Sequence, residues 1–289
     1  HPAQWKNPTP DNPYNLVVLG GGTAGLVTAS IGAGLGAKVA LIERHLMGGD
    51  CLNVGCVPSK AIIRAARVLA TIKESHKFGL TFPGDVQHDF GCVMSRMRRV
   101  RSELSRVDSA ERFKELGVDV FIGNGQFASS NTLTVDGTTL KFSRAVICTG
   151  TNPAPLNVSG LGLNDYLTNE SIFSITKLPQ RLAVIGAGPV GCELAQAFAR
   201  FGSQVTLLEE AENILPREDS DASEIVQNQL NRDGVQVLCN TTIKSVEVRA
   251  NDKRIHYGLG NQATCIDVDS LLASVGRRAN IQRLGLEKA

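Results

Sequence analysis

Apolar and polar positions form blocks near the start of the chain. An apolar run at 14–19 is followed by a glycine-rich turn and by a mixed stretch that reaches about Gly36. A second apolar run covers 38–42 and ends at an acidic residue, Glu43. Short apolar runs bounded by glycine are typical of buried strands, and the stretch between them is long enough for a helix. The pattern therefore predicts a strand–helix–strand unit.

The same order of blocks returns in the second half of the chain. A predicted strand at 181–185 leads into a glycine-rich turn, and the helix that follows ends at Gly202. A second strand at 204–208 ends at Glu209. Strands that alternate with helices indicate parallel sheets, so the predicted fold class is α/β, with two Rossmann-like nucleotide-binding domains in tandem.

The glycine-rich turns carry the first chemical signal. The first glycine of each turn allows a tight bend, the second lets a pyrophosphate approach the backbone, and the third lets the helix pack on the strand. The helix N-terminus attracts the anion, and the terminal acid binds ribose hydroxyls. The alternative is a strand–helix turn without a ligand. The spacing is the same in both copies: Gly20, Gly22 and Gly25, then Gly186, Gly188 and Gly191.

The acid of the second copy also indicates which nicotinamide nucleotide binds. Glu209 is followed by Glu210, whereas an arginine nearby would accommodate a 2′-phosphate. Because two carboxylates repel that phosphate, we expect NADH to be preferred over NADPH.

The segment between the two copies completes the first predicted domain. Asp136-Gly137 indicates a type I′ hairpin turn, and a loop with Pro153 and Pro155 marks a domain boundary. The elements expected before that loop are a helical stretch at 89–116, a strand at 118–122, hairpin strands at 132–135 and 138–142, and a strand at 145–150. After the second glycine turn, strands are expected at 235–238, 242–249, 254–257, 264–268 and 270–275.

Two cysteines, Cys51 and Cys56, follow the first glycine turn closely. Positions i and i+5 of a straight helix point about 140° apart, so a disulfide between them needs an irregular turn, which Gly55 would allow. The pattern indicates a redox dithiol. A static disulfide and two unpaired core cysteines are the alternatives.

A helix is predicted directly after the cysteines, over 59–69, and Pro58 suits its first turn. The N-terminus of that helix and the Lys60 ammonium would both favour a thiolate at Cys56. The predicted helix therefore favours reactive sulfur over a structural role.

Composition narrows the function classes only modestly. The 289 residues, 42% of them hydrophobic, allow two domains with their own cores, and the net charge of +2 gives no sign of a nucleic-acid partner. Basic residues at 96–101 are followed by acids, which is typical of a solvated helix face. No apolar run reaches the roughly 18 residues of a membrane span, and the opening at 1–13 lacks a signal-peptide core. We interpret that opening as part of a trimmed or cleaved chain.

Cysteine usage indicates a reducing, cytoplasmic location. Seven cysteines in a chain of this length do not make a disulfide scaffold. No resident metal site is predicted. Five cysteines are expected to lie singly in apolar surroundings: Cys92, Cys148, Cys192, Cys239 and Cys265.

The two nucleotide motifs and the cysteine segment at 48–60 together resemble the flavin disulfide reductases. The segments at 149–153 and 275–280 carry the same resemblance, and 43–56 is most similar to mercuric-reductase-like members. This class I pyridine nucleotide-disulfide oxidoreductase family also includes lipoamide dehydrogenase and glutathione reductase. The resemblance covers nearly the whole chain in the family's order.

The resemblance implies a three-layer ββα FAD-binding domain at 1–152, an NAD(P)-binding domain at 153–276 that is inserted in it in the full-length family, and the start of a return segment at 277–289. It implies FAD at the first motif and NAD(P)H at the second. Electrons would pass from the nicotinamide through the flavin to a Cys51–Cys56 disulfide. The substrate would be another disulfide or a thiophilic metal ion.

Roles for individual residues also follow from the resemblance. Cys56 would be the flavin-proximal thiol, Cys51 would exchange with substrate, and Glu193 would pair with Lys60 beside the flavin. Further cofactor contacts are implied for Thr23, Ala24, Gly49, Asp50, Lys60, Gly125, Thr149, Gly150, Pro189, Val190 and Gly276.

Departures from the family pattern set the remaining expectations. Asp50 stands where many relatives have threonine, and mercuric reductases usually take NADPH, in contrast to the prediction from Glu209. Relatives continue past this chain's last residue, Ala289, into a dimerisation domain whose His-Glu pair serves the partner's site. The full-length form is therefore expected to be a homodimer, and the alternative for this chain is a non-catalytic dinucleotide-binding module.

Overall fold

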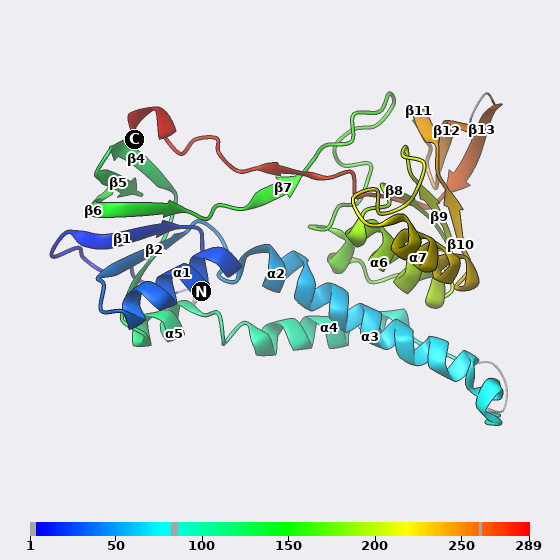
Figure 1. Ribbon diagram of the computed structural model, residues 1–289, viewed down its shortest axis with the longest axis horizontal. Helices are drawn as coiled ribbons and strands as arrows, with labels where there is room; N and C mark the ends of the chain where they lie inside the picture. Colours follow the sequence, from blue (N-terminus) through cyan, green and yellow to red (C-terminus); the bar gives the residue numbers. More distant parts are fainter. Residues whose placement is uncertain (1–3, 82–85, 260–261) are drawn as a thin grey trace. The chain divides into compact units, whose positions relative to one another are not determined.

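The computed structural model describes residues 4–81, 86–259 and 262–289 (Figure 1). The chain forms two compact units, which are described separately. The first unit combines His1–Val57, Arg99–Asn152 and Arg278–Ala289, and the second combines Pro58–Arg98 with Pro153–Arg277.

The first unit is built on a sheet in the order β3-β2-β1-β6-β5-β4. The first four of these strands run parallel, and the last two continue the sheet as an antiparallel meander. Their bounds are β1 Tyr14–Leu19, β2 Val39–Glu43, β3 Val118–Ile122, β4 Gly125–Ser129, β5 Thr132–Val135 and β6 Thr138–Ile147. The helices between β1 and β3 along the chain are α1 Thr23–Gly34, α2 Gly49–Val54, α3 Cys56–Lys73, α4 Phe90–Leu104 and α5 Ala110–Glu115, of which α3 and α4 belong mainly to the second unit.

Alternate residues of β1 serve two cores, which makes the unit three-layered. Val17 and Leu19 pack with Leu133 and Leu140 of the meander. Val18 packs instead in the cluster that α1 and α5 cover. This alternation follows from the two-residue period of a strand.

Two predicted elements of this unit differ from the structure. The strands expected at 138–142 and 145–150 are one strand, β6, which pairs with β5 at its start and with β1 further along. The helical stretch expected at 89–116 is interrupted before α5, where the Ser109 hydroxyl caps the new helix by accepting a hydrogen bond from the Arg112 N–H. The type I′ turn is confirmed, since Asp136 and Gly137 both have positive φ, 44° and 88°.

The second unit repeats the arrangement with a parallel sheet in the order β10-β9-β8-β14. A three-stranded antiparallel sheet, β11-β12-β13, packs on it through Val246, Ile255 and Tyr257. The bounds are β8 Arg181–Ile185, α6 Pro189–Arg200, β9 Gln204–Leu208, α7 Ser220–Arg232, β10 Val235–Leu238, β11 Thr241–Val248, β12 Lys253–Leu259, β13 Gln262–Val268 and β14 Ser270–Ala273. The remaining elements are β7 Thr151–Pro153, β15 Arg277–Ala279, η1 Ser75–Phe78, η2 Ile172–Ser174 and η3 Leu286–Lys288.

The second unit also takes residues that the sequence analysis assigned to the first domain. Pro58–Arg98 clusters with the second unit, because the Phe90 ring packs 5.7 Å from the rings of both Phe198 and Phe201. The α/β class and the parallel sheets agree with the prediction. Within the described part of the chain, no helix combines the length and apolar character needed to cross a bilayer.

Candidate active site

The first glycine-rich turn joins β1 to α1 through backbone that requires glycine. Gly20 has a φ of +108°, and a Cβ on it would lie 2.2 Å from the Cys148 carbonyl oxygen. A Cβ on Gly25 would lie 1.7 Å from the Gly20 carbonyl oxygen, so this glycine lets α1 begin close to β1. Gly22 caps α1 in extended backbone without a side-chain cap. The first N–H groups of α1 can therefore bind an anion such as pyrophosphate.

Glu43 ends β2 beside this turn. Its carboxylate accepts hydrogen bonds from the Gly21 N–H at 2.7 Å and the His45 N–H at 2.8 Å. Each carboxylate oxygen keeps a further lone pair for a ribose hydroxyl. The turn and the acid together fit a dinucleotide such as FAD.

The second turn has the same construction. Gly186 has a φ of +96°, and a Cβ on Gly191 would lie 2.0 Å from the Gly186 carbonyl oxygen. The Glu209 carboxylate accepts hydrogen bonds from the Ala187 N–H at 2.6 Å and the Ala211 N–H at 3.0 Å. A Cβ on Gly188 would meet nothing within 4 Å, so space remains where a pyrophosphate would approach. These residues fit a nicotinamide dinucleotide.

The two cysteines of the dithiol lie on consecutive helices. Cys51 is the third residue of α2, Cys56 begins α3, and Gly55 breaks the helix between them with φ −141° and ψ −112°. Both cysteines are free thiols, and the Cys56 side chain lies close enough to raise the pKa of Cys51. The irregular backbone that the spacing predicts is therefore confined to Gly55, and Pro58 lies in the first turn of α3.

Glycines allow the start of α2, the helix that carries Cys51, to contact the first nucleotide turn. The Gly48 N–H donates to the Gly21 carbonyl oxygen at 2.8 Å. Gly49 has a φ of +56°, and a Cβ on it would lie 2.6 Å from the Gly22 Cα. The start of α2 thus touches the start of α1, which the sequence did not predict.

Asn53, near the end of α2, hydrogen-bonds back to the start of that helix. Its side-chain amide donates to the carbonyl oxygens of Met47 at 3.1 Å and Gly49 at 2.8 Å. The Arg101 guanidinium donates to the Asn53 carbonyl oxygen at 2.9 Å. Neither residue was among the predicted site residues, because an amide beside a cysteine motif carries no specific sequence signal.

The environment of Cys51 disfavours its thiolate form. Burial raises the pKa of the Cys51 thiol, the hydrogen bond with Cys56 raises it further, and a negative charge on Cys56 acts in the same direction. A hydrogen bond with the Thr23 side chain lowers it.

The other cysteines have different surroundings. Cys192 is buried, and its thiol donates to the Ala187 carbonyl oxygen at 3.3 Å. Burial and the Glu209 carboxylate raise the pKa of Cys192 to about 12, so it is protonated at neutral pH. Cys92 and Cys265 are exposed, which corrects the prediction of apolar surroundings for these two.

Lys60 is exposed on α3, and Glu193 is half-buried on α6. Within the described ranges, none of the ion pairs joins these two side chains. Their pairing beside a flavin remains a prediction. Asp50 lies in the first turn of α2, and its contact with flavin likewise remains a prediction.

Two predicted cofactor contacts, Thr149 and Gly150, hydrogen-bond with Asn280 near the end of the chain. The Thr149 hydroxyl donates to the Asn280 carbonyl oxygen at 2.7 Å, and the Asn280 side-chain amide donates to the Thr149 carbonyl oxygen at 2.9 Å. The Asn280 N–H donates to the Gly150 carbonyl oxygen at 3.0 Å. Asn280 was part of the motif at 275–280, but its role in holding Thr149 was not predicted.

The remaining predicted cofactor residues lie on the two nucleotide scaffolds. Gly125 begins β4, where a Cβ would lie 3.2 Å from the Ile42 side chain, so the residue allows close packing under the sheet. Ala24 lies in the first turn of α1, and Pro189 and Val190 lie in that of α6. Gly276 has a φ of +111°, and its carbonyl oxygen accepts a hydrogen bond from the Ala154 N–H at 2.9 Å.

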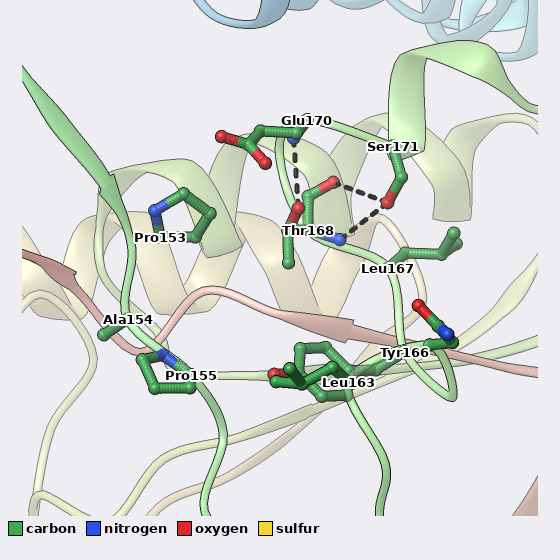
Figure 2. A pocket seen from close by; sticks show the side chains of 10 residues that line it. Pro153, Ala154, Pro155, Leu163, Tyr166, Leu167, Thr168, Glu170 and Ser171 are labelled. Carbon is green, nitrogen blue, oxygen red and sulfur yellow. Dashed lines mark hydrogen bonds between the residues drawn. The ribbon is translucent and has the colours of Figure 1, made fainter.

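A separate cavity of about 440 Å³ lies in the second unit (Figure 2). The turn at 168–171 forms one side, held by hydrogen bonds between Thr168 and Ser171 and by the Glu170 N–H, which donates to the Thr168 hydroxyl. It is lined by Pro153, Ala154, Pro155, Leu163, Asn164, Tyr166, Leu167, Thr168, Glu170 and Ser171. These lining residues include none of the predicted site residues, so the dithiol chemistry is not located there.

Known proteins resemble the chain along nearly its whole length. It is 36% identical over 281 residues to a dihydrolipoyl dehydrogenase of Acholeplasma laidlawii, which covers 95% of this chain and 82% of that protein. It is 34% identical over 277 residues to a mercuric reductase of Lysinibacillus sphaericus, and the match covers 96% of this chain and 50% of that protein. The chain spans about half the length of that mercuric reductase.

Solved structures also resemble the chain along nearly its whole length. The HOCl-induced flavoprotein disulfide reductase RclA from Escherichia coli superposes with a TM-score of 0.81 at 28% identity, covering 96% of this chain and 59% of that protein. Its Cu(II) complex superposes with a TM-score of 0.80 at 27% identity, covering 96% and 60%. The family model described as "pyridine nucleotide-disulphide oxidoreductase" matches residues 14–289. The predicted resemblance is confirmed, and the chain belongs to the pyridine nucleotide-disulphide oxidoreductase family.

Proposed function

We propose that the chain is the nucleotide-binding part of an FAD-dependent NAD(P)H oxidoreductase that works through a Cys51–Cys56 redox disulfide. The family uses FAD and NAD(P)H. The observation that carries the proposal is the proximity of Cys56 to Cys51, which lies on the α2 helix in contact with the first nucleotide turn. When bound, FAD would accept a hydride from the nicotinamide and supply two electrons.

The cysteines themselves would carry the disulfide exchange. Two electrons and two protons convert the Cys51–Cys56 disulfide to a pair of thiols. The Cys51 thiolate then attacks one sulfur of a substrate disulfide and releases the other as a thiol, after which Cys56 displaces the bound half and re-forms the disulfide. The raised pKa of Cys51 means that a base must take its proton before the attack.

A thiophilic metal ion is the other substrate class that suits this site. Two thiolates are soft ligands, and a soft cation such as Hg(II) would bind between them. Relatives named dihydrolipoyl dehydrogenase and mercuric reductase match the chain at similar identity, so both substrate classes belong in the assay.

Two further features belong to this proposal. The Glu209 carboxylate beside the second turn would bind the adenosine ribose and favour NADH over NADPH. Lys60 and Glu193 would act beside the flavin, where a cation stabilises a reduced, anionic ring. We also propose that the full-length enzyme is a cytoplasmic homodimer acting on a small molecule or a metal ion, without a nucleic-acid or membrane partner.

The test begins with the protein reconstituted with FAD under anaerobic conditions. One equivalent of NADH should produce two additional titratable thiols per chain and a long-wavelength absorption band. The Cys56→Ser variant should show neither. A protein that binds NADH but gains no thiols would instead support the non-catalytic dinucleotide-binding module.

The substrate is identified in a second step with the full-length protein. NADH oxidation is measured with oxidised lipoamide, oxidised glutathione and Hg(II) in parallel. Turnover that needs both cysteines and occurs with one of the three assigns the substrate class. Turnover that survives Cys51→Ser would contradict the dithiol mechanism.

A further inference from the structure

The sheet of the first unit ends on one side at β3, and the N-terminal segment, residues 4–13, contacts that edge. The Asn7 side-chain amide donates to the Ile122 carbonyl oxygen at 2.9 Å and accepts from the Ile122 N–H at 2.8 Å. The Trp5 indole N–H donates to the Val120 carbonyl oxygen at 3.3 Å. These three backbone groups of β3 face away from β2, on the side where a further strand would pair.

Contacts on both sides of Asn7 hold the segment in place. Trp5 is half-buried and packs against the apolar cluster that includes Val118 and Val120 of β3. The Asp11 carboxylate forms an ion pair with the Lys38 ammonium, directly before β2. Asn7 lies between these two anchors and outside any strand, so its side-chain amide takes the place of a peptide group opposite Ile122.

The β3 strand has no protection of its own against pairing with another strand. Its sequence, Val118–Ile122, contains four apolar residues, three of them β-branched, and neither proline nor lysine. It pairs with β2 without a register shift, so no bulge turns its edge away. Its one charged side chain, Asp119, accepts a hydrogen bond from the Tyr14 hydroxyl at 2.8 Å. An edge of this kind pairs readily with a further strand unless it is covered.

The N-terminal segment covers β3 without creating a new edge. Its hydrogen bonds to β3 come from the side chains of Trp5 and Asn7 rather than from a backbone ladder. Pro8 and Pro10 follow Asn7 and have no N–H to donate to another strand. The segment therefore ends the sheet instead of extending it.

We propose that the N-terminal segment blocks a strand-pairing surface, the outer edge of β3, and that the partner it excludes is a second copy of this chain. When Trp5 and Asn7 leave β3, the freed groups of Val120 and Ile122 pair with the β3 edge of the other copy. A second copy fits because it carries the same apolar, β-branched strand, and two identical edges pair with each other about a two-fold axis. This proposal does not depend on the dithiol or on a bound nucleotide.

The experiment combines amide hydrogen exchange with sedimentation velocity on the 289-residue chain. The double variant Trp5→Ala/Asn7→Ala removes all three hydrogen bonds to β3. In dilute solution its Ile122 N–H should exchange about ten-fold faster than in the parent, because that N–H loses its acceptor. At about 100 μM the double variant should form dimers or larger species that the parent does not form. Exchange at Ile122 should then slow again, because the second copy covers the same edge.

A matched control lies in the same segment. Asn12 is exposed and lies two residues before β1, which β2 separates from β3. Asn12→Ala makes the same chemical change as Asn7→Ala, and its exchange and sedimentation should match those of the parent. Circular dichroism checks folding. If the double variant does not fold, the single variant Asn7→Ala, which removes two hydrogen bonds of an exposed side chain, is compared with Asn12→Ala instead.

Each outcome decides the proposal. Faster exchange at Ile122 in dilute solution, together with self-association that restores its protection, supports the blocking role. Unchanged exchange would show that the segment does not cover β3, and faster exchange without self-association would show that it excludes no second copy. Self-association that leaves Ile122 unprotected would place the contact elsewhere. Each of these three results overturns the proposal, and none of them bears on the thiols that NADH produces.

Discussion

The two nucleotide turns share their backbone construction but differ in what packs against them. In both, a Cβ on the third glycine would overlap a carbonyl oxygen, at 1.7 Å for Gly25 and 2.0 Å for Gly191. In both, the acid that ends the second strand accepts an N–H from the turn, at 2.7 Å for Glu43 and 2.6 Å for Glu209. Two distant parts of the sequence therefore form the same kind of dinucleotide cradle.

The difference lies at the second glycine. A Cβ on Gly22 would lie 3.5 Å from the Gly49 Cα, whereas a Cβ on Gly188 would meet nothing within 4 Å. The first turn therefore carries the helix that holds Cys51, and the second leaves that space open. A glycine contact therefore brings the helix of Cys51 to the anion-binding end of the first turn.

The largest expected effect comes from removing the dithiol, which should leave the first turn a plain nucleotide site like the second. Cys51→Ser or Cys56→Ser should lower NADH-dependent reduction of a small aromatic disulfide at least about a thousand-fold in the FAD-loaded protein, because the exchange needs both sulfurs. FAD affinity should be retained. Cys148→Ser, which removes another half-buried thiol, is the control, and equal loss in that variant would contradict the assignment.

The second prediction concerns an ion pair that only the second copy has at the end of its glycine-motif helix. The α1 helix has no basic residue in its last turn, whereas Arg200 of α6 donates to Asp233 at 3.0 and 2.9 Å. Asp233→Ala should lower the free energy of unfolding by about 3 kcal/mol, because it strands a largely buried guanidinium. Glu103→Ala, which breaks an exposed pair, should change it by less than about 1 kcal/mol.

The same aspartate predicts a pH dependence. Burial raises the pKa of Asp233, but hydrogen bonds from Arg200, Gln229 and Gln196 outweigh it and leave the pKa below its ordinary value. Its stabilising contribution is therefore complete above about pH 4 and is lost as the pH falls through the lowered folded-state pKa. The free energies of unfolding in urea of the parent and of Asp233→Asn should converge below the folded-state pKa of Asp233. A difference that persists unchanged in acid would contradict this origin.

The third prediction tests the glycines themselves. Gly25→Ala should destabilise the protein by about 2 kcal/mol in urea unfolding, since the new Cβ overlaps the Gly20 carbonyl oxygen. Gly188→Ala should cost less than about 1 kcal/mol, because nothing lies within 4 Å of the new Cβ, yet it should weaken NADH binding by filling the pyrophosphate space. Equal losses of stability would show that the two positions are packed alike.

The smallest effect is expected from the acid of the second turn. Glu209→Gln should weaken NADH binding about ten-fold and reduce the preference over NADPH, because a charged acceptor for the ribose is lost. Isothermal titration with both nucleotides measures the two affinities. Glu212→Gln, an exposed neighbour, should leave them unchanged. A stronger preference for NADH in Glu209→Gln would reverse the assigned role.

Much of each nucleotide unit could be predicted from local sequence. The strands at 14–19 and 181–185 coincide with β1 and β8, and the glycine spacing marks the starts of α1 and α6. Such runs are short, apolar and bounded by glycine, so their local pattern determines the strand. The break inside 89–116 was missed because the helix cap at Ser109 interrupts an otherwise helical pattern.

Membership of the units depends on contacts that the local pattern does not encode. The sequence placed Pro58–Arg98 with the first domain, but it clusters with the second, since Phe90 packs on Phe198 and Phe201. Phe90 is apolar, which predicts that its side chain is buried but not which residues it packs against. Partners come from the fold, because packing joins residues distant in sequence.

The sequence by itself determined the duplicated nucleotide motifs, the family and the presence of two cysteines beside the first turn. Only the tertiary structure decided that Gly22 touches Gly49 and that Gly188 faces open space. Glycine spacing is a property of adjacent residues and is visible in the sequence. Which helix fills the space beside a glycine depends on how separate segments pack, and that is a property of the folded chain.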